Sequence, residues 1–351
     1  MVEPFSEPPP RTVHSLRCSD IRSRPDLAPG SVDLVVTSPP YPMIRMWDEL
    51  FSGQSPEVKG ALREGRGPEA FEAMHRLLDG AWEVSVRALR DGGFLCVVVG
   101  DATRTLGGRF ALYPNHLRVL EACRRLGLTP LPSVLWSKPT NSPNKFLGSG
   151  MLPPGAYVTL EHEHILIFRK GSNRRFTTPA DRARRRSSAI FFEERNRWFT
   201  DRWTLTGTRQ RLEGLTGRSR SAAFPLEVPY RLIAMFSVLS DRVLDPFAGS
   251  GTTLVAALGL GRESVGVEQD KGLCRRALER LAIGWAPVEA RNRLRLEEHR
   301  RWLADHPFPP ATHPHALYDF PVVSRAERYA RILHVDRVDR ESDGSVVAQY
   351  T

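Results

Sequence analysis

Two short loops carry the residue types best suited to hold a nucleotide-like ligand and to act on a second molecule beside it. The first loop runs from Asp245 to Thr253, reads D-P-F-A-G-S-G-T-T, and lies between a predicted strand and a predicted helix. Its glycines let the backbone turn tightly and approach a ligand, and a helix beginning there offers free N–H groups to an anion. Glu268 follows 23 residues after Asp245, where an acid typically binds ribose hydroxyls. The pattern predicts a nucleotide-type cradle.

Two familiar phosphate-binding loops do not match this segment. A Walker loop needs a lysine after its last glycine, but Thr252 follows Gly251. A dinucleotide fingerprint needs a third glycine, and Leu254 or Val255 stands in its place. Both differences weigh against a phosphate-binding loop.

The second loop, Thr37 to Tyr41, reads T-S-P-P-Y and ends the apolar run that begins at Val32. Its two prolines make it rigid, and an open α/β sheet places its reactive groups beyond the carboxyl ends of its strands. The loop therefore presents a hydroxyl from Ser38, a fixed carbonyl from Pro39 and the aromatic face of Tyr41 together.

Alternating strand and helix patterns predict the elements that position these loops. Continuous apolar runs predict strands over 32–37, 94–101, 133–136, 163–168, 242–247 and 264–269, and helical periodicity predicts helices over 71–89, 117–126 and from 252. This alternation is the signature of an α/β fold. We divide the chain into a flexible arm (1–13), a half with the T-S-P-P-Y loop (14–170), an insertion (171–220), a half with the glycine loop (221–285), and a C-terminal helix and tail (286–351) to which the pattern assigns no role.

The charge of the chain favours an anionic partner, nucleic acid first. The 351 residues carry a net charge of +10, and lysine supplies only five of the 50 basic residues. Residues 171–220 hold 13 arginines against five acidic residues, with six aromatic residues interleaved. Guanidinium groups suit phosphates and guanine edges, so we predict nucleic-acid contacts by Arg174, Arg175, Arg184, Arg185, Arg186, Arg195 and Arg197. A solvated basic face, or a GC-rich coding sequence that favours arginine, is the alternative.

The two loops and several shorter motifs resemble the amino-methylating DNA methyltransferases, in the permuted β-class order in which T-S-P-P-Y precedes D-P-F-x-G-S-G-T-T. The resemblance covers about residues 14–285 and includes Ser19-Asp20, Gly92-Gly93, Gly100-Asp101, W-S-K-P at 136–139, the strand from His164 to Lys170, and Ala223-Phe224-Pro225. It implies a Rossmann-like methyltransferase fold: a mostly parallel sheet with helices on both faces, and residues 171–220 as the target-recognition region.

The resemblance also implies partners and roles for individual residues. S-adenosyl-L-methionine (AdoMet) is the implied cofactor and double-stranded DNA the implied substrate. The implied cofactor-binding residues are Asp20 at the adenine, Phe224 and Pro225 at the methionine end, and Asp245, Pro246, Phe247, Gly249, Gly251, Thr252 and Glu268. The implied catalytic residues are Ser38, Pro39, Pro40 and Tyr41. Family members that read S-P-P-Y mostly methylate cytosine N4, whereas D-P-P-Y and N-P-P-Y mostly accompany adenine N6, so Ser38 favours cytosine.

The expected reaction is direct methyl transfer to the exocyclic amine of a base extruded from the duplex. Ser38 and the Pro39 carbonyl would accept hydrogen bonds from the amine, and Tyr41 would stack on the base. Adenine N6 methylation is the alternative within the family. A nucleotide-dependent oxidoreductase shares the strand-glycine-helix-acid order but leaves the T-S-P-P-Y loop unexplained, and a DNA-binding protein without activity is a third reading.

Metal, thiol and membrane chemistry are not indicated. Strand alternation puts the two histidines of Glu161-His162-Glu163-His164 on one face without further ligands nearby in sequence, so we predict no metal site. None of the four cysteines follows a proline, which disfavours cytosine C5 methylation, and they form no C-x-x-C pair. No run approaches the ~18 apolar residues of a membrane span. We expect a cytoplasmic protein with a cognate restriction endonuclease as a further partner; the sequence sets no oligomeric state.

Overall fold

One ten-stranded sheet organises the chain in the computed structural model, which describes residues 10–23, 26–138, 147–206, 224–306 and 310–351. In spatial order its strands are β10 (Arg202–Thr204), β6 (Leu128–Ser137), β9 (His162–Lys170), β3 (Leu89–Val99), β2 (Val32–Thr37), β11 (Arg242–Asp245), β12 (Glu263–Glu268), β1 (Thr12–Cys18), β16 (Val346–Tyr350) and β15 (Val335–Arg340). Each of the six predicted strands overlaps one of these strands, so the expected α/β fold is confirmed.

The strand directions create one functional edge. β9 runs antiparallel to β3 and β6, and the terminal pair β16 and β15 is also antiparallel to its neighbours. The other neighbouring strands run parallel. The carboxyl ends of β1, β2, β3, β6, β11 and β12 therefore meet at one edge, which we call the carboxyl edge, together with the amino end of β9. Open parallel sheets bind their ligands at this edge.

Helices cover both faces of the sheet, as the sequence predicts. On one face, α3 (Gly67–Ala88) and α4 (Asn115–Arg125) pack into a core with the apolar residues of β2 and β3. On the other face, α7 (Glu227–Phe236), α8 (Thr252–Gly259), α9 (Lys271–Ile283) and α10 (Ala286–Asp305) contribute to a second core. Gly92 and Gly93 lie within β3, and α3, which overlaps the predicted helix over 71–89, ends before them at Ala88. No helix among the described residues is long and apolar enough to cross a membrane.

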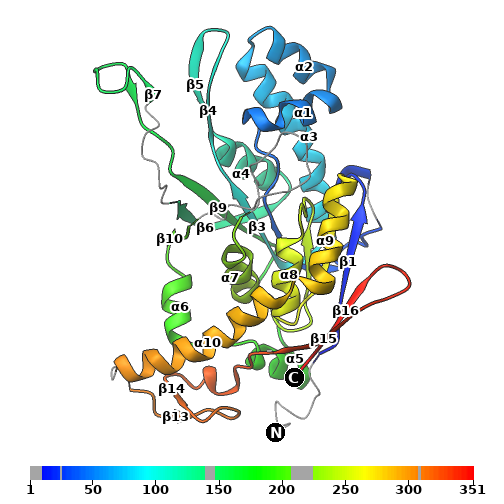
Figure 1. Cartoon of the computed structure of the whole chain (residues 1–351), viewed down its shortest axis with the longest axis vertical. Coiled ribbons are helices and arrows are strands. Elements are labelled where there is room, and N and C mark those ends of the chain that lie inside the picture. The colour runs from blue at the N-terminus through cyan, green and yellow to red at the C-terminus, as the bar shows by residue number, and fades with distance from the viewer. Residues whose placement is uncertain (1–9, 24–25, 139–146, 207–223, 307–309) are drawn as a thin grey trace.

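Short helices and hairpins stand beyond the carboxyl edge (Figure 1). They are η2 (Arg45–Trp47), α1 (Asp48–Gln54), α2 (Pro56–Arg63), the hairpin of β4 (Ala102–Leu106) and β5 (Arg109–Tyr113), and the hairpin of β7 (Leu147–Gly148) and β8 (Ala156–Tyr157). The remaining short elements are η1 (Ile21–Ser23), α5 (Pro179–Ser187), α6 (Phe192–Trp198), β13 (His313–Pro314), β14 (Pro321–Val322) and η3 (Glu327–Tyr329). Both hairpins project from the same side of the molecule as α1 and α2, whereas α5 lies at the opposite end.

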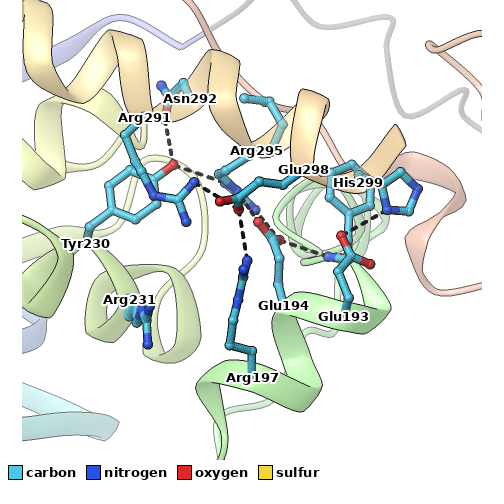
Figure 2. A network of polar contacts seen from close by, with 12 residues as sticks. Glu193, Glu194, Arg197, Tyr230, Arg231, Arg291, Asn292, Arg295, Glu298 and His299 are labelled. Carbon is cyan, nitrogen blue, oxygen red and sulfur yellow. Dashed lines mark hydrogen bonds and ion pairs between the residues drawn. The ribbon is translucent and has the colours of Figure 1, made fainter. Parts of the chain in front are cut away.

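A buried polar network ties the insertion to the C-terminal region (Figure 2). Arg295 of α10 donates to both carboxylate oxygens of Glu194 of α6, at 2.6 and 2.7 Å, and the two side chains are 5% and 1% exposed. One turn further along α10, His299 lies 3.0 Å from a carboxylate oxygen of Glu193. Tyr230 of α7 donates to Asn292 at 2.6 Å. Residues 286–351, to which the sequence assigned no role, thus hold α6 against the second core, and their β16 extends the sheet beyond β1.

The aromatic residues of the insertion have a structural role as well. Phe191, Trp198 and Trp203 are at most 1% exposed, and the indole N–H of Trp203 donates to the carbonyl of Trp198 at 3.0 Å. The part of the insertion from 207 to 220 lies outside the described residues. Within the described part, burial rather than stacking on bases accounts for these three aromatic side chains.

We predict that Arg295→Met lowers the free energy of unfolding by about 3–5 kcal/mol, because it leaves the buried carboxylate of Glu194 without its cation. The double variant Glu194→Gln/Arg295→Met should recover a large part of that loss. Arg300→Met is the matched control, because Arg300 pairs with Asp319 on the surface with side chains 50% and 82% exposed. Urea unfolding measures all three; equal values for Arg295→Met and Arg300→Met would contradict the assignment.

Candidate functional site

One buried hydrogen bond joins the two loops that the sequence singled out. The hydroxyl of Thr37, the last residue of β2, donates to Asp245 Oδ1 at 2.7 Å, and Asp245 is the last residue of the neighbouring β11. Thr37 is 0% and Asp245 3% exposed. The same carboxylate accepts from Thr253 Oγ1 at 2.6 Å and from the backbone N–H of Phe247 at 3.1 Å. The T-S-P-P-Y loop and the glycine loop therefore leave the carboxyl edge side by side.

Asp245 is a buried carboxylate at the centre of this junction. Burial raises its pKa to about 6, although the hydrogen bonds from Thr253, Thr37 and Phe247 act in the opposite direction. Near neutral pH the group is thus ionised, but at an energetic cost. A cationic ligand beside it would reduce that cost.

The glycine loop forms an open cradle in front of α8. Gly249 and Gly251 have φ angles of +53° and +80°, in the left-handed region that favours glycine. A Cβ on Gly251 would lie 3.0 Å from Ala277 of α9, so this glycine permits close packing. A Cβ on Gly249 would meet nothing closer than the Phe247 carbonyl oxygen at 3.9 Å. Gly249 therefore borders space that a ligand can occupy.

Two acidic residues from adjacent strands flank this cradle. Glu268 ends β12, and its two carboxylate oxygens accept from the backbone N–H groups of Gly249 and Asp270, each at 2.9 Å. Burial raises the pKa of Glu268. Asp20 follows the neighbouring β1, and its pKa is lowered mainly by the side chain of Arg22, which donates to both of its oxygens. Glu268 thus contacts Gly249 directly, and Asp20 lies just beyond the end of the next strand.

The remaining predicted cofactor residues fall into two groups. Phe247 is half-buried at the open cradle, where its ring meets Trp82 edge to face at 5.9 Å, and Pro246 beside it is buried. Thr252 and Phe224 are committed to packing: the Thr252 hydroxyl accepts from Arg280 at 3.1 Å, and Phe224 is 7% exposed in the second core. Pro225, half-buried, accepts from the N–H of Val228 at the start of α7.

Ser38 and Tyr41 of the T-S-P-P-Y loop are hydrogen-bonded to each other, and Tyr41 is also bonded to Glu163, an acid to which the sequence assigned no catalytic role. Ser38 Oγ lies 2.9 Å from Tyr41 Oη, and Tyr41 Oη donates to Glu163 Oε2 at 2.9 Å. Lys138, from the end of β6, pairs with the other oxygen of Glu163. Pro39 is buried and Pro40 half-buried between Ser38 and Tyr41. The four predicted catalytic residues thus lie together at the carboxyl edge, and Glu163 joins them because β9 runs in the reverse direction.

A second titratable cluster lies beside this group. Asp101, His116 and His164 bring one potential metal ligand each to within 4.8 Å of the others. The rings of His116 and His164 are stacked, with centroids 3.9 Å apart and planes inclined by 11°. Imidazole lone pairs lie in the ring plane, so stacked parallel rings cannot both direct them at one ion about 2.0–2.1 Å away. The cluster instead forms a hydrogen-bonded contact in which His116 Nδ1 meets Asp101 at 2.7 Å.

The predicted DNA-contacting arginines do not gather at the carboxyl edge. Arg174 donates to both oxygens of Asp241, at 2.6 and 2.9 Å, just before β11 and thus at the opposite edge of the sheet. Its guanidinium is committed to a structural ion pair, so its contact with DNA stays a prediction that this position does not support. The neighbouring Arg175 is exposed.

The other predicted arginines lie on α5 and α6. Ser188, directly after α5, accepts from the backbone N–H of Leu239, which also precedes β11. The α5 residues Arg184, Arg185 and Arg186 are thus on the side away from the T-S-P-P-Y loop. Of the two on α6, Arg195 is exposed, and Arg197 pairs with Glu298 at 2.9 Å. Their contact with DNA stays a prediction.

Comparisons with known proteins identify the family. Residues 32–279 match the N6/N4 methyltransferase family model, described as DNA methylase. The type II methyltransferase M.MthZI of Methanothermobacter thermautotrophicus is 48% identical over 262 residues, which cover 74% of each chain. The type II methyltransferase M.MjaI of Methanocaldococcus jannaschii is 46% identical over 273 residues, covering 75% of this chain and 89% of that one. The chain belongs to the N6/N4 DNA methyltransferase family.

Solved structures agree with this assignment. The DNA modification methylase TTHA0409 of Thermus thermophilus, complexed with S-adenosyl-L-methionine, is 35% identical and matches with a TM-score of 0.59 over 78% of this chain and 96% of that one. The PvuII DNA methyltransferase, which is cytosine-N4-specific, is 18% identical with a TM-score of 0.51 over 78% of this chain and 88% of that one. At that identity the second match shows the shared fold alone.

We predict that Asp245→Asn removes a pH-dependent penalty from the folded protein. The folded-state pKa of about 6 exceeds the usual value of 3.8, so the native state loses stability as pH rises from 4 through 6. Relative to Asp245→Asn, the wild type should lose about 2 kcal/mol between pH 4 and pH 7, because each tenfold change in the protonation equilibrium is worth about 1.4 kcal/mol and the unfolded carboxyl is already partly ionised at pH 4. Urea unfolding at both pH values measures the difference; a constant difference would contradict the raised pKa.

Proposed function

We propose that the protein transfers a methyl group from AdoMet to the exocyclic N4 amine of cytosine in double-stranded DNA. The observation that carries this proposal is the Thr37–Asp245 hydrogen bond, which holds the Ser38 hydroxyl beside the open cradle of Gly249. Ser38 at the first position of the S-P-P-Y loop favours cytosine. Adenine N6 is the second candidate, because the family acts on either amine.

The residues of the cradle fit AdoMet by charge and shape. When bound, AdoMet supplies an electrophilic methyl on a sulfonium and carries an ammonium, so the buried carboxylate of Asp245 matches a cation. Glu268 presents a carboxylate to ribose hydroxyls, and Asp20 lies on the next strand. Gly249 leaves room for the ligand where any side chain would intrude.

The T-S-P-P-Y loop acts on the base by position rather than by covalent attack. Ser38 and the Pro39 carbonyl accept hydrogen bonds from the amine, which turns its lone pair toward the methyl group and stabilises developing positive charge. Tyr41 offers its ring to the base. The base reaches this site only when it is extruded from the duplex.

Product analysis tests the proposal directly. Plasmid DNA from cells that express the protein is digested to nucleosides and separated, and N4-methylcytosine is the expected product. Tyr41→Ala should abolish the product while it retains AdoMet affinity, because stacking on a base is worth ~1–3 kcal/mol and also orients it. A product that is only N6-methyladenine would contradict the cytosine assignment, and no methylated base would contradict the proposal itself.

We predict that Gly249→Leu abolishes AdoMet binding, because its side chain occupies the open space of the cradle. Gly127→Leu is the matched control: Gly127 also has a left-handed φ, +82°, and a Cβ placed on it would meet nothing within 4 Å, but it lies after α4 at the start of β6. Calorimetric titration with AdoMet compares the two folded variants. Equal affinity in both would remove Gly249 from the cofactor site.

We infer that DNA lies across the carboxyl edge between the two hairpins and the short helices α1 and α2. Phe110 of β5 and Tyr157 of β8 stack at 4.5 Å with planes 8° apart, so the hairpins support each other. Met151 and Leu152 in the β7–β8 turn are 84% and 72% exposed. Exposed apolar side chains of this kind can insert between neighbouring base pairs of bound DNA. DNA bound in this way would lie beside Ser38 and away from α5.

We predict that Arg45→Ala/Arg109→Ala weakens DNA binding more than the triple alanine variant of Arg184, Arg185 and Arg186. Arg45 in η2 and Arg109 at the β4–β5 turn are exposed on the carboxyl-edge side. Each lost phosphate contact should flatten the slope of log affinity against log salt by about 0.9. DNA binding over a salt series measures both slopes; the reverse ranking would return the recognition role to α5.

The names of the close relatives supply one further partner. Because M.MthZI and M.MjaI are type II methyltransferases, we infer that a restriction endonuclease of the same sequence specificity accompanies this protein. The two enzymes share a DNA site, so their association does not require direct contact.

A further inference from the structure

We propose that Glu163 is a positioning residue that ends a hydrogen-bond relay from the target amine through Ser38 and Tyr41. Glu163 fixes Ser38 as an acceptor toward the base and takes up the proton that the methylated amine releases. The inference rests on the proposed function and adds to it a residue outside the T-S-P-P-Y loop.

The relay is continuous in the structure. Glu163 Oε2 accepts from Tyr41 Oη at 2.9 Å, and Tyr41 Oη lies 2.9 Å from Ser38 Oγ. Lys138 holds the other oxygen of Glu163, whose side chain is 15% exposed. A Cβ on Gly100, at the end of β3, would lie 3.1 Å from the Tyr41 ring and 3.2 Å from Glu163 Cγ. The absence of a side chain at Gly100 therefore lets Tyr41 and Glu163 meet.

The direction of each hydrogen bond follows from counting protons. Burial, followed by the negative charge of Glu163, raises the pKa of Tyr41 well above its usual value, so the phenol keeps its single proton near neutral pH. That proton is donated to the Glu163 carboxylate, which can only accept. Ser38 must then donate its own proton to Tyr41 Oη, and its oxygen presents lone pairs alone to the base.

This polarity selects an amine. The N4 amine of cytosine and the N6 amine of adenine donate hydrogen bonds, whereas thymine O4 and guanine O6 offer only lone pairs in the corresponding positions. A carbonyl opposite Ser38 would leave two acceptors facing each other without a proton between them. Glu163 thus contributes to the choice of base through two intervening hydroxyl groups.

The same hydrogen-bond relay accounts for the proton that the reaction releases. As the N–CH3 bond forms, the S–CH3 bond breaks and the sulfonium becomes a neutral thioether. The methylated nitrogen, now cationic, passes a proton to Ser38 Oγ, Ser38 passes its proton to Tyr41 Oη, and Tyr41 passes its proton to Glu163 Oε2. The amine, the serine and the tyrosine end neutral, and Glu163 ends as a carboxylic acid.

The groups around Glu163 define which ionisations matter. Among the described residues of the neighbouring elements, Lys138 just after β6 and Tyr41 of the T-S-P-P-Y loop face it, and Gly100 just after β3 lies beside it. On β9 itself, His164 turns to Asp101 and His116 and His162 is exposed, as is Glu161 just before the strand. The ion pair with Lys138 holds one oxygen of Glu163 and leaves the other to Tyr41.

The test compares Glu163→Gln with Glu161→Gln, a matched change two residues away on an exposed side chain. Single-turnover methylation of a cytosine-containing duplex is measured from pH 5 to 8 at saturating AdoMet. We expect a loss of about 100-fold for Glu163→Gln, of the size that proton transfer contributes, and wild-type rates for Glu161→Gln. Glu163→Gln should also change the pH dependence of the rate, whereas Glu161→Gln should keep the wild-type profile.

A double-mutant cycle and a spectroscopic signature separate the relay from simple packing. Tyr41→Phe keeps the ring but breaks the relay, so adding Glu163→Gln to it should cost nothing further. The spectroscopic signature is an NMR chemical shift, measured on cofactor-free protein with 13C at the ζ carbon of tyrosine. The Tyr41 resonance is the one that disappears in Tyr41→Phe. Its chemical shift should change in Glu163→Gln and stay the same in Glu161→Gln.

Three results would each overturn the relay while the methyltransferase proposal stands. They are additive losses in the double-mutant cycle, a Tyr41 resonance that does not move in Glu163→Gln, and a Glu163→Gln rate and pH profile equal to those of the wild type. Failure of the wild type to methylate any amine overturns both. AdoMet affinity and the free energy of unfolding are measured for every variant and show whether a slow variant has lost its fold. If Glu163→Gln does not fold, Glu163→Asp replaces it in the same comparison, because its shorter side chain cannot bring the carboxylate to Tyr41.

Discussion

The hydrogen bond between Thr37 and Asp245 is the contact on which the rest of the site depends. It links two residues 208 positions apart in the chain, at the ends of adjacent parallel strands. A buried carboxylate is stable only when its oxygens are satisfied, and Asp245 receives the Thr37 hydroxyl, the Thr253 hydroxyl and the Phe247 N–H. Because this carboxylate requires Thr37, the loop that follows Thr37 is held beside the loop that follows Asp245.

The sheet topology extends this arrangement to residues far apart in sequence. The parallel strands β1, β11 and β12 deliver Asp20, the glycine loop and Glu268 to the carboxyl edge, and β2 delivers Ser38. Because β9 runs antiparallel to β3, its amino end lies at this edge, and Glu163 near that end contacts Tyr41. One edge therefore combines the open cradle at Gly249, the T-S-P-P-Y loop, and the carboxylate of Glu163 that accepts from Tyr41.

The sequence predicted what local patterns encode. The buried parallel strands are continuous apolar runs, and the two loops follow them with glycine and proline at the turns, so the fold and the sites of Asp245 and Ser38 could be derived. Glu163 could not be assigned, because its role depends on an antiparallel strand whose neighbours are unknown before the sheet order is known. The alternation in Glu161-His162-Glu163-His164 did indicate which side chains share a face, but not which face meets Tyr41.

The charge and aromatic content of the insertion did not predict its structure, because neither property shows which side chains are buried. The arginines and aromatic residues of 171–206 suggested a DNA-reading surface, yet Trp198 and Trp203 are core residues and Arg174 neutralises Asp241. In the C-terminal region, α10 offered no recognisable motif, because its Arg295 acquires a role only when Glu194 of α6 lies opposite. A long-range ion pair of this kind has no local sequence signature.

The central claim is that Thr37, on the strand of the base-handling loop, controls the site of the cofactor through Asp245. Calorimetric titration of AdoMet into Thr37→Val, across pH 5 to 8, tests it most directly, with Thr105→Val on the exposed β4 strand as the control. Thr37→Val should bind AdoMet about fivefold more weakly than the wild type, as the loss of a hydrogen bond worth ~1 kcal/mol implies. The pH at which binding is half-maximal should also rise, because Asp245 loses a hydrogen-bond donor that lowers its pKa. An affinity and a midpoint equal to those of the control would contradict the claim.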